Sequence, residues 1–419
     1  MAYTVNMLVK SRKMVYTCIV MRKHHLSLFF IFCVCAGINF FACRKAPEKK
    51  YIAFYSLSPD TVQALQTVLK DRFSTIEQHF DWRIIDPALS VTEFMEKNPQ
   101  TAFVFSTDNR SLFEARRFFT LHATEPFQNL PSTFLNNIFD HDDAQYYAFP
   151  LLIDPIKLAC NNVITEKLGL NSYIMQDDFE RLLQQAVQAS IPFPFVCAGG
   201  EDKQLFAMIS TIAAMNGLAL NPDDFSMLGK QTDLRKDCPA VLKTTLDTLV
   251  EWRKQGLLHP EWFRLVESDI SVFMEFNSTA LAVMPLSASR RLKHEILQHF
   301  TTMQVPLPQL LSKKNMPADT IVWVQAVQDE HKPFPEADEI QAFLYLQETD
   351  EALARATGLA PVFAAAQTQD TEASSGRYWV ASSNTALPSF GNIACTTETE
   401  KAALAAAIRR YLEVNGVGY

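Results

Sequence analysis

Residues 102–110 read Ala102-Phe103-Val104-Phe105-Ser106-Thr107-Asp108-Asn109-Arg110, an apolar run followed by a polar turn. The run 102–105 is uniformly apolar, as expected for a strand that is buried on both faces. Upstream, residues 51–55 and 82–85 predict two more strands, and the helix between them begins at Ser58. An order of strand, helix, strand and polar turn is typical of an open parallel sheet. The sequence therefore predicts an α/β fold.

The polar turn is also a candidate ligand site. Open parallel sheets bind ligands beyond the carboxyl ends of their strands, which singles out residues 56–58 and the group Asp108, Asn109 and Arg110. In an alternative interpretation, Asp108 or Asn109 caps the helix that begins near Leu112.

Composition excludes several classes of protein. The chain has 419 residues, of which 48% are hydrophobic and 20% are charged, and its formal net charge is -8. A disordered chain would be less apolar and more highly charged. The length suggests two lobes or domains. The acidic balance disfavours binding to nucleic acid, because such binding depends on basic side chains.

The N-terminus has the pattern of a secretory signal. A short basic stretch at 21–25 precedes the apolar residues 26–42, which Cys43 and a polar segment follow. The apolar segment is shorter than the roughly 20 residues that a membrane span needs. The pair Ala42-Cys43 resembles the cleavage site of a bacterial lipoprotein, in which the cysteine, here Cys43, is lipidated and anchors the chain to the membrane.

We therefore expect residues 1–42 to be a signal region and residues 43–50 to be a lipidated tether. Residues 1–20 are not needed by the signal, so we expect translation to begin at Met21, with Met14 as the alternative start. An uncleaved N-terminal membrane anchor is the alternative. Both interpretations place residues 44–419 outside the cytoplasm, on the periplasmic side.

Motifs of catalysis and metal binding are not found in the sequence. His294 and His299 are five residues apart, whereas a zinc-protease helix needs a spacing of four. The chain has no Walker loop, Rossmann fingerprint or G-x-S-x-G motif. Four cysteines beyond Cys43 lack the CxxC spacing of zinc sites, and whether two of them form a disulfide is left open: Cys160, Cys197, Cys238 and Cys395. We expect no cofactor, no metal and no catalysis.

A family resemblance emerges from four stretches of sequence. The first is Tyr147-Ala148-Phe149-Pro150-Leu151-Leu152-Ile153-Asp154-Pro155-Ile156-Lys157-Leu158-Ala159-Cys160-Asn161-Asn162, continued by residues 165–170. It resembles the family 1 extracellular solute-binding proteins, the maltose-binding-protein-like receptors of bacterial ABC importers. Three more stretches match the family in the right order, although Asn277 stands where glycine is usual: 246–260, 273–284 and 337–363.

The resemblance implies a periplasmic-binding-protein type II-like fold, with two α/β lobes and a ligand cleft and hinge between them. The cleft would close around a solute by a hinge motion, and the importer's membrane subunits would recognise the closed form. By family order, lobe one would hold residues 50–152 and 286–325, and lobe two would hold residues 154–284 and 326–419.

The resemblance also implies site residues. It places Asp154 in the cleft, where the carboxylate would accept hydrogen bonds from sugar hydroxyls or pair with a cationic ligand; the alternative is an Asp-Pro turn at a strand end. It matches Asp108 and Arg110 to the acid and arginine of sugar-binding members. Trp323 lies near the third crossover and would either stack on a sugar or be buried in the sheet.

Further candidates lie on both expected lobes. Glu201 and Asp202 follow a Gly-Gly strand exit, and their alternative role is a solvated helix N-terminus. Ser287, with Ser289 and Arg290, would supply hydrogen bonds where sugar binders carry stacking aromatics. These small polar residues predict a monosaccharide, a polyol or another small solute rather than an extended oligosaccharide.

The sequence thus predicts a lipid-anchored extracytoplasmic receptor that delivers a small solute, with a carbohydrate favoured, to an ABC importer. One alternative is a surface lipoprotein that uses the same fold for host or partner contact without transport. Another is a secreted hydrolase, which would need two carboxyl groups roughly 5–10 Å apart across the cleft.

Overall fold

The computed structural model describes residues 49–119, 127–140, 145–169, 176–220, 225, 228, 234–236, 238–327, 335–363, 365–366 and 371–415. The chain divides into two compact units, 1–49 and 50–419, and the helices and strands below belong to the second. The expected signal region and Cys43 lie outside the described residues. Within the described part, no helix combines the length and apolarity needed to cross a bilayer.

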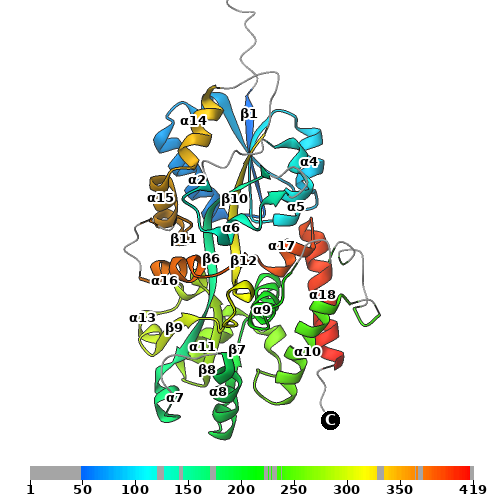
Figure 1. Cartoon of the computed structure of the whole chain (residues 1–419), viewed down its shortest axis with the longest axis vertical. Coiled ribbons are helices and arrows are strands. Elements are labelled where there is room, and N and C mark those ends of the chain that lie inside the picture. Colours follow the sequence, from blue (N-terminus) through cyan, green and yellow to red (C-terminus); the bar gives the residue numbers. More distant parts are fainter. Residues whose placement is uncertain are drawn as a thin grey trace, which may run out of the picture. The chain divides into compact units, whose positions relative to one another are not determined.

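Strands and helices alternate along the chain, as the sequence predicts (Figure 1). The strands are β1 (Lys50–Tyr55), β2 (Phe80–Ile84), β3 (Thr101–Ser106), β4 (Phe139–Asp140), β5 (Gln145–Tyr146), β6 (Phe149–Asn161), β7 (Phe193–Val196), β8 (Thr279–Pro285), β9 (Phe300–Gln304), β10 (Asn315–Ala326), β11 (Ala360–Pro361) and β12 (Thr385–Leu387). The helices are α2 (Pro59–Arg72), α3 (Ile76–His79), α4 (Val91–Lys97), α5 (Asn109–Glu114), α6 (Ser132–Leu135), α7 (Asn162–Lys167), α8 (Gln176–Gln188), α9 (Asp202–Met215), α10 (Ala240–Lys254), α11 (Glu267–Glu275), α12 (Leu286–Ser289), α13 (His294–Leu297), α14 (Pro335–Leu344), α15 (Gln347–Thr357), α16 (Thr371–Ala381), α17 (Phe390–Ala394) and α18 (Glu398–Asn415).

The first strands form the predicted parallel arrangement. β1 pairs in parallel with β2 on one side and with β3 on the other. The intervening helix α2 begins after Ser58, whose side chain accepts a hydrogen bond from the Thr61 amide, and Pro59 occupies its first turn. Because β1 and β3 run in the same direction, their polar carboxyl ends, at Ser56 and Ser106, lie at one edge of the sheet.

Two long strands connect the halves of the molecule (Figure 1). The first half of β6 pairs with β10, as in Ile153 opposite Ile321, and the second half pairs with β8 and β9. The strand does not end in an Asp-Pro turn after Ile153, so that interpretation is wrong. Pro155 lies inside β6 beside a register shift of the β6–β10 ladder, and such irregular positions are where sheets tolerate proline.

Two large hydrophobic cores define two lobes, which confirms the predicted two-lobed α/β fold. The first lobe packs around side chains such as Phe54, Phe105 and Leu152, and its described core residues lie within 52–153 and 316–386, with Leu286 added. The second lobe packs around side chains such as Ile209 and Trp262, and a smaller cluster adjoins it. Its described core residues lie within 156–305 and 387–412.

The expected lobe boundaries need correction in the second half of the chain. β9 was expected in lobe one, but it pairs with the end of β6, and Phe300 packs against Ala159 in the second lobe. α14 and α15 were expected in lobe two, but Leu344 and Leu353 are buried in the first core. The chain returns to the second lobe at β12 and not at the end of β10, because β10 runs into the first lobe and pairs with β3.

The cysteines of the described part are free thiols: Cys160, Cys197, Cys238 and Cys395. All but Cys238 are buried, and burial raises the pKa of the Cys160 thiol to about 11. The sequence left open whether two of these cysteines form a disulfide. In the structure all four are free thiols.

Candidate functional site

A polar cavity of about 420 Å³ lies where the two lobes meet. We call it the cleft. It is lined by the ends of β1 and β3, by the paired strands β6 and β10, by the starts of α2, α9, α11 and α12, and by the end of α15: Ser56, Ser58, Asp60, Thr61, Thr107, Asp154, Glu201, Lys203, Gln204, Glu267, Ser287, Arg290, Arg291, Asp319, Thr320, Thr357 and Leu359. A smaller cavity of about 50 Å³ adjoins it and shares Ser56, Thr107, Lys203, Asp319 and Thr320.

Ser56 marks the strand edge that the sequence singled out. Its backbone φ is 58°, a left-handed conformation that is uncommon for a residue other than glycine and that concentrates at functional sites. Thr107 donates a hydrogen bond to the Ser56 carbonyl over 2.8 Å and thereby joins the ends of β1 and β3. Both residues line the cleft.

Asp154 and Ser287 come together at the wall of the cleft. Asp154 is 2% exposed, and its Oδ1 accepts a hydrogen bond of 3.0 Å from the Ser287 amide in the first turn of α12. Burial, followed by the charge of Asp319, raises the pKa of Asp154 to about 7. The sequence predicted both residues as ligand contacts, and that role stays a prediction.

Asp319 was missed by the sequence reasoning. It lies in β10 at the register shift opposite Asp154 and Pro155, and it is 8% exposed. Its Oδ2 accepts a hydrogen bond of 3.0 Å from Thr320, whereas its Oδ1 has no hydrogen-bond donor among the described residues. Burial raises the pKa of Asp319. The sequence did hold one signal for Asp319 as a site residue, because it is the only charged residue of the strand β10.

Asp108 and Arg110 do not line the cleft, so their expected ligand role is corrected. Asp108 is fully buried and caps α5, because its Oδ1 accepts a hydrogen bond of 2.9 Å from the Ser111 amide. The alternative interpretation, an N-cap, is therefore confirmed. Arg110 donates from Nε to Glu114 over 2.9 Å within the same helix.

Asn109 and Trp323 contact each other rather than the cleft. Trp323 is 0% exposed and donates from Nε1 to the Asn109 Oδ1 over 2.6 Å. The predicted stacking of Trp323 on a ligand is thus replaced by its alternative, burial in the sheet. Asn109 lines a different cavity, of about 640 Å³, together with residues such as Tyr146 and Asn384.

Glu201 and Asp202 lie at opposite sides of the start of α9. Glu201 lines the cleft, and its Oε1 accepts a hydrogen bond of 3.2 Å from the Glu267 amide. Asp202 lines the smaller cavity and forms an ion pair of 2.7 Å with Arg409. The preceding Gly200 is required by packing, because a Cβ there would lie 2.5 Å from the Arg264 carbonyl oxygen.

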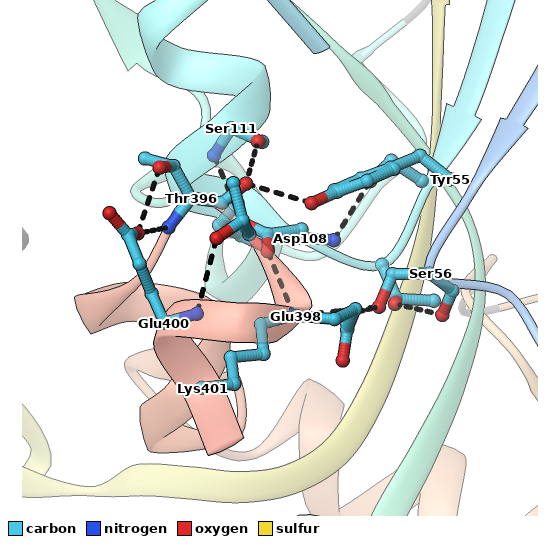
Figure 2. A network of polar contacts seen from close by, with 12 residues as sticks. Tyr55, Ser56, Asp108, Ser111, Thr396, Glu398, Glu400 and Lys401 are labelled. Atoms are coloured by element: carbon cyan, nitrogen blue, oxygen red, sulfur yellow. Dashed lines mark hydrogen bonds and ion pairs between the residues drawn. The ribbon is translucent and has the colours of Figure 1, made fainter. Parts of the chain in front are cut away.

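A buried polar network joins the lobes beside the smaller cavity (Figure 2). Lys401 of α18 lies 2.8 Å from both the Asp108 and the Glu398 carboxylates, and it is 6% exposed. Ser56 donates to Glu398 over 2.6 Å, and Tyr55 donates to the Thr396 carbonyl over 2.8 Å.

We call this network, completed by Ser111 and its 2.8 Å hydrogen bond to the Thr396 carbonyl, the interlobe latch. Burial alone would lower the pKa of Lys401, but the neighbouring carboxylates of Asp108 and Glu398 raise it, so the ammonium form is retained. The latch therefore places the charged pair Asp108 and Lys401 at a contact between the two lobes, although these residues are far apart in sequence.

Comparison with known proteins gives a match at the level of structure. No family profile and no curated protein sequence matches the chain. The bacterial solute receptor AcbH, described as preferring β-D-galactopyranose, is 10% identical with a TM-score of 0.64, covering 88% of this chain and 99% of its own.

Two more solved structures are similar. A family 1 extracellular solute-binding protein from Bifidobacterium longum subsp. infantis is 11% identical, with a TM-score of 0.57 over 88% of this chain and 98% of its own. A sugar transporter from Bacillus licheniformis, in complex with stachyose, is 13% identical, with a TM-score of 0.56 over 88% and 96%. The chain therefore has the two-lobed fold of family 1 extracellular solute-binding proteins.

Proposed function

We propose that this protein is a family 1 solute-binding receptor of an ABC importer, and that it binds a small polar solute such as a sugar or polyol in the cleft. The observation that carries the proposal is the position of the cleft. It lies between the lobes, on the strands that join them, and its lining is mainly hydroxyl, carboxylate and basic side chains. Proteins of the same fold are described in complex with, or as preferring, sugars.

The lining also limits the size of the solute. Extended sugars are commonly held by stacking on aromatic rings, but none of the described residues that line the cleft is aromatic. Hydrogen bonds between the solute and the hydroxyl oxygens of Ser56, Thr107 and Ser287 would have to replace stacking. These features favour a monosaccharide-sized solute over an oligosaccharide.

Export and anchoring complete the proposal. The signal region at 1–42 and the lipidated Cys43 would hold residues 44–419 on the periplasmic side of a membrane, close to the importer. Hinge closure around the solute would bring the two lobes into the arrangement that the importer's membrane subunits recognise. The support for this part is the sequence pattern of the N-terminus.

The proposal is tested by expressing residues 44–419, which contain the whole compact unit 50–419. The protein is purified gently and denatured, and any released solute is identified by mass spectrometry. A parallel thermal-shift scan with sugars and polyols should give a higher melting temperature for the true ligand, because binding to the folded state alone stabilises it. Recovery of the solute in intact form would argue against the alternative that the protein is a hydrolase. Release of no solute, with no shift in the scan, would contradict the proposal.

Asp154→Ala is expected to lower affinity for the identified solute by about tenfold or more, because a buried hydrogen-bonding carboxylate at the cleft wall is lost. Titration calorimetry measures the change. Glu114→Ala is the control, since that carboxylate pairs with Arg110 outside the cleft. Equal affinity of Asp154→Ala and the unmodified protein would remove Asp154 from the site.

A further inference from the structure

The floor of the cleft holds two buried carboxylates on neighbouring strands. In the ladder between β6 and β10, Thr320 pairs with Asp154 and Ala318 pairs with Pro155, so Asp319 occupies the register shift between those pairs. Both carboxylates line the cleft, and each is more than nine-tenths buried, with exposed fractions of 2% for Asp154 and 8% for Asp319. The residues come from segments more than 160 positions apart in the sequence.

The basic side chains that line the cleft form no ion pair with these two carboxylates in the described part of the chain. Among the described residues, no cation lies within salt-bridge distance of either carboxylate, whereas Arg291 holds both oxygens of Glu267 at 2.5 and 2.7 Å. Lys203 acts on Asp319 only through its charge, and its side chain is exposed. Oδ1 of Asp319 has no donor in the described part of the chain. Buried carboxylates without a cation are costly, and a partner relieves that cost.

We propose that the solute carries a protonated primary or secondary amino group, and that the Asp154–Asp319 pair binds it. The proposal rests on the proposed function of the cleft and adds the chemical class of the solute, an amino sugar or a similarly small hydrophilic amine. The N–H groups of an ammonium would donate to Asp319 Oδ1 and to the acceptor sites of Asp154 that the Ser287 amide leaves open.

Two other cations fit this pair less well. Quaternary ammonium groups are recognised by cages of aromatic rings, and in the part of the chain that the structure describes no aromatic side chain lines the cleft. Calcium takes about six to eight oxygen ligands, and within the described residues no group of three or more His, Cys, Asp or Glu side chains is placed to hold a metal ion. An ammonium with several N–H donors is therefore the best-matched occupant.

The experiment compares amines with matched neutral solutes by titration calorimetry on residues 44–419. D-glucosamine and D-galactosamine are paired with D-glucose and D-galactose, and putrescine is paired with 1,4-butanediol. We expect at least one amine to bind at least about tenfold more tightly than its neutral partner. Equal or tighter binding of the neutral members overturns this inference and leaves the receptor proposal standing. Absence of binding by every compound, with no co-purified solute, contradicts both.

Asp319→Asn is expected to abolish the preference for the amine, because it removes one negative charge and keeps the size of the side chain. Asp71→Asn is the matched control, since Asp71 is exposed on α2 and does not line the cleft. Asp319→Asn should fold at least as stably as the unmodified protein, because it relieves an uncompensated buried charge. Unchanged amine affinity in Asp319→Asn overturns the proposal.

The affinity for putrescine is expected to rise by about tenfold per pH unit from about pH 5 to about pH 7. Asp154 has a pKa raised to about 7, so protons compete with the ammonium below that pH. Lys203, Glu267 and Arg291 act on the pair through their charges. The other charged residues that line the cleft are Asp60, Glu201 and Arg290. A flat pH profile for the amine, equal to that of a neutral solute, would contradict the proposal.

Discussion

Lys401→Met is expected to lower the free energy of unfolding by about 3–5 kcal/mol, because it leaves the buried Asp108 carboxylate without its cation. Asp108 is fully buried, and Lys401 is 2.8 Å away in the interlobe latch (Figure 2). The lobes can relieve part of this cost by separating, which would hydrate Asp108. Denaturant unfolding measures the stability, and small-angle X-ray scattering measures whether the radius of gyration increases.

Two controls separate the latch from a general effect of losing a lysine. Lys70→Met removes an exposed ion pair of 2.6 Å with Glu77 and should change stability by less than about 0.5 kcal/mol. The double variant Asp108→Asn/Lys401→Met should recover most of the lost stability, because asparagine still caps α5 and carries no charge. A loss below about 1 kcal/mol in Lys401→Met, with an unchanged radius of gyration, would show that the latch does not hold the lobes together.

Trp323→Ala should also cost about 3–5 kcal/mol, because it opens a cavity in the first core and leaves Asn109 without its indole donor. Trp323→Phe fills most of the space and loses only the hydrogen bond, so we expect a smaller cost of about 1–3 kcal/mol. Denaturant unfolding of both variants provides the measurement.

The affinity of Trp323→Phe for the solute separates a core residue from a ligand contact. Trp323 is 0% exposed and does not line the cleft, so its replacement by another ring should leave the affinity unchanged. A large loss of affinity in Trp323→Phe, without a loss of stability, would return Trp323 to the binding site.

Local patterns predicted the elements that depend on neighbours in sequence. The apolar run of β3, the Ser58 cap of α2 and the capping role of Asp108 are all properties of a few consecutive residues. The placement of the cleft at the ends of β1 and β3 follows from the direction of two parallel strands, which the alternation of strand and helix already indicates.

Patterns of this kind did not predict which core a helix covers. The helix α15 has an apolar side that includes Leu353, and such a side can pack on either lobe. Its place in the first core is decided by β10, which carries the chain back beside β3. The family resemblance predicted the order of the lobes, but it assigned α15 to the second lobe, whereas Leu353 of α15 packs in the first core.

The sequence by itself determined the α/β class, the two-lobed architecture through its resemblance to a family, and Asp154 as a candidate for the cleft. Only the tertiary structure decided that Asp319 joins Asp154, that Lys401 pairs with Asp108, and that Trp323 is buried. The physical reason is the same in each case. Each of these buried side chains contacts a partner that is more than 160 residues away in sequence. Such contacts, and the burial that accompanies them, form only when the strands and lobes pack together.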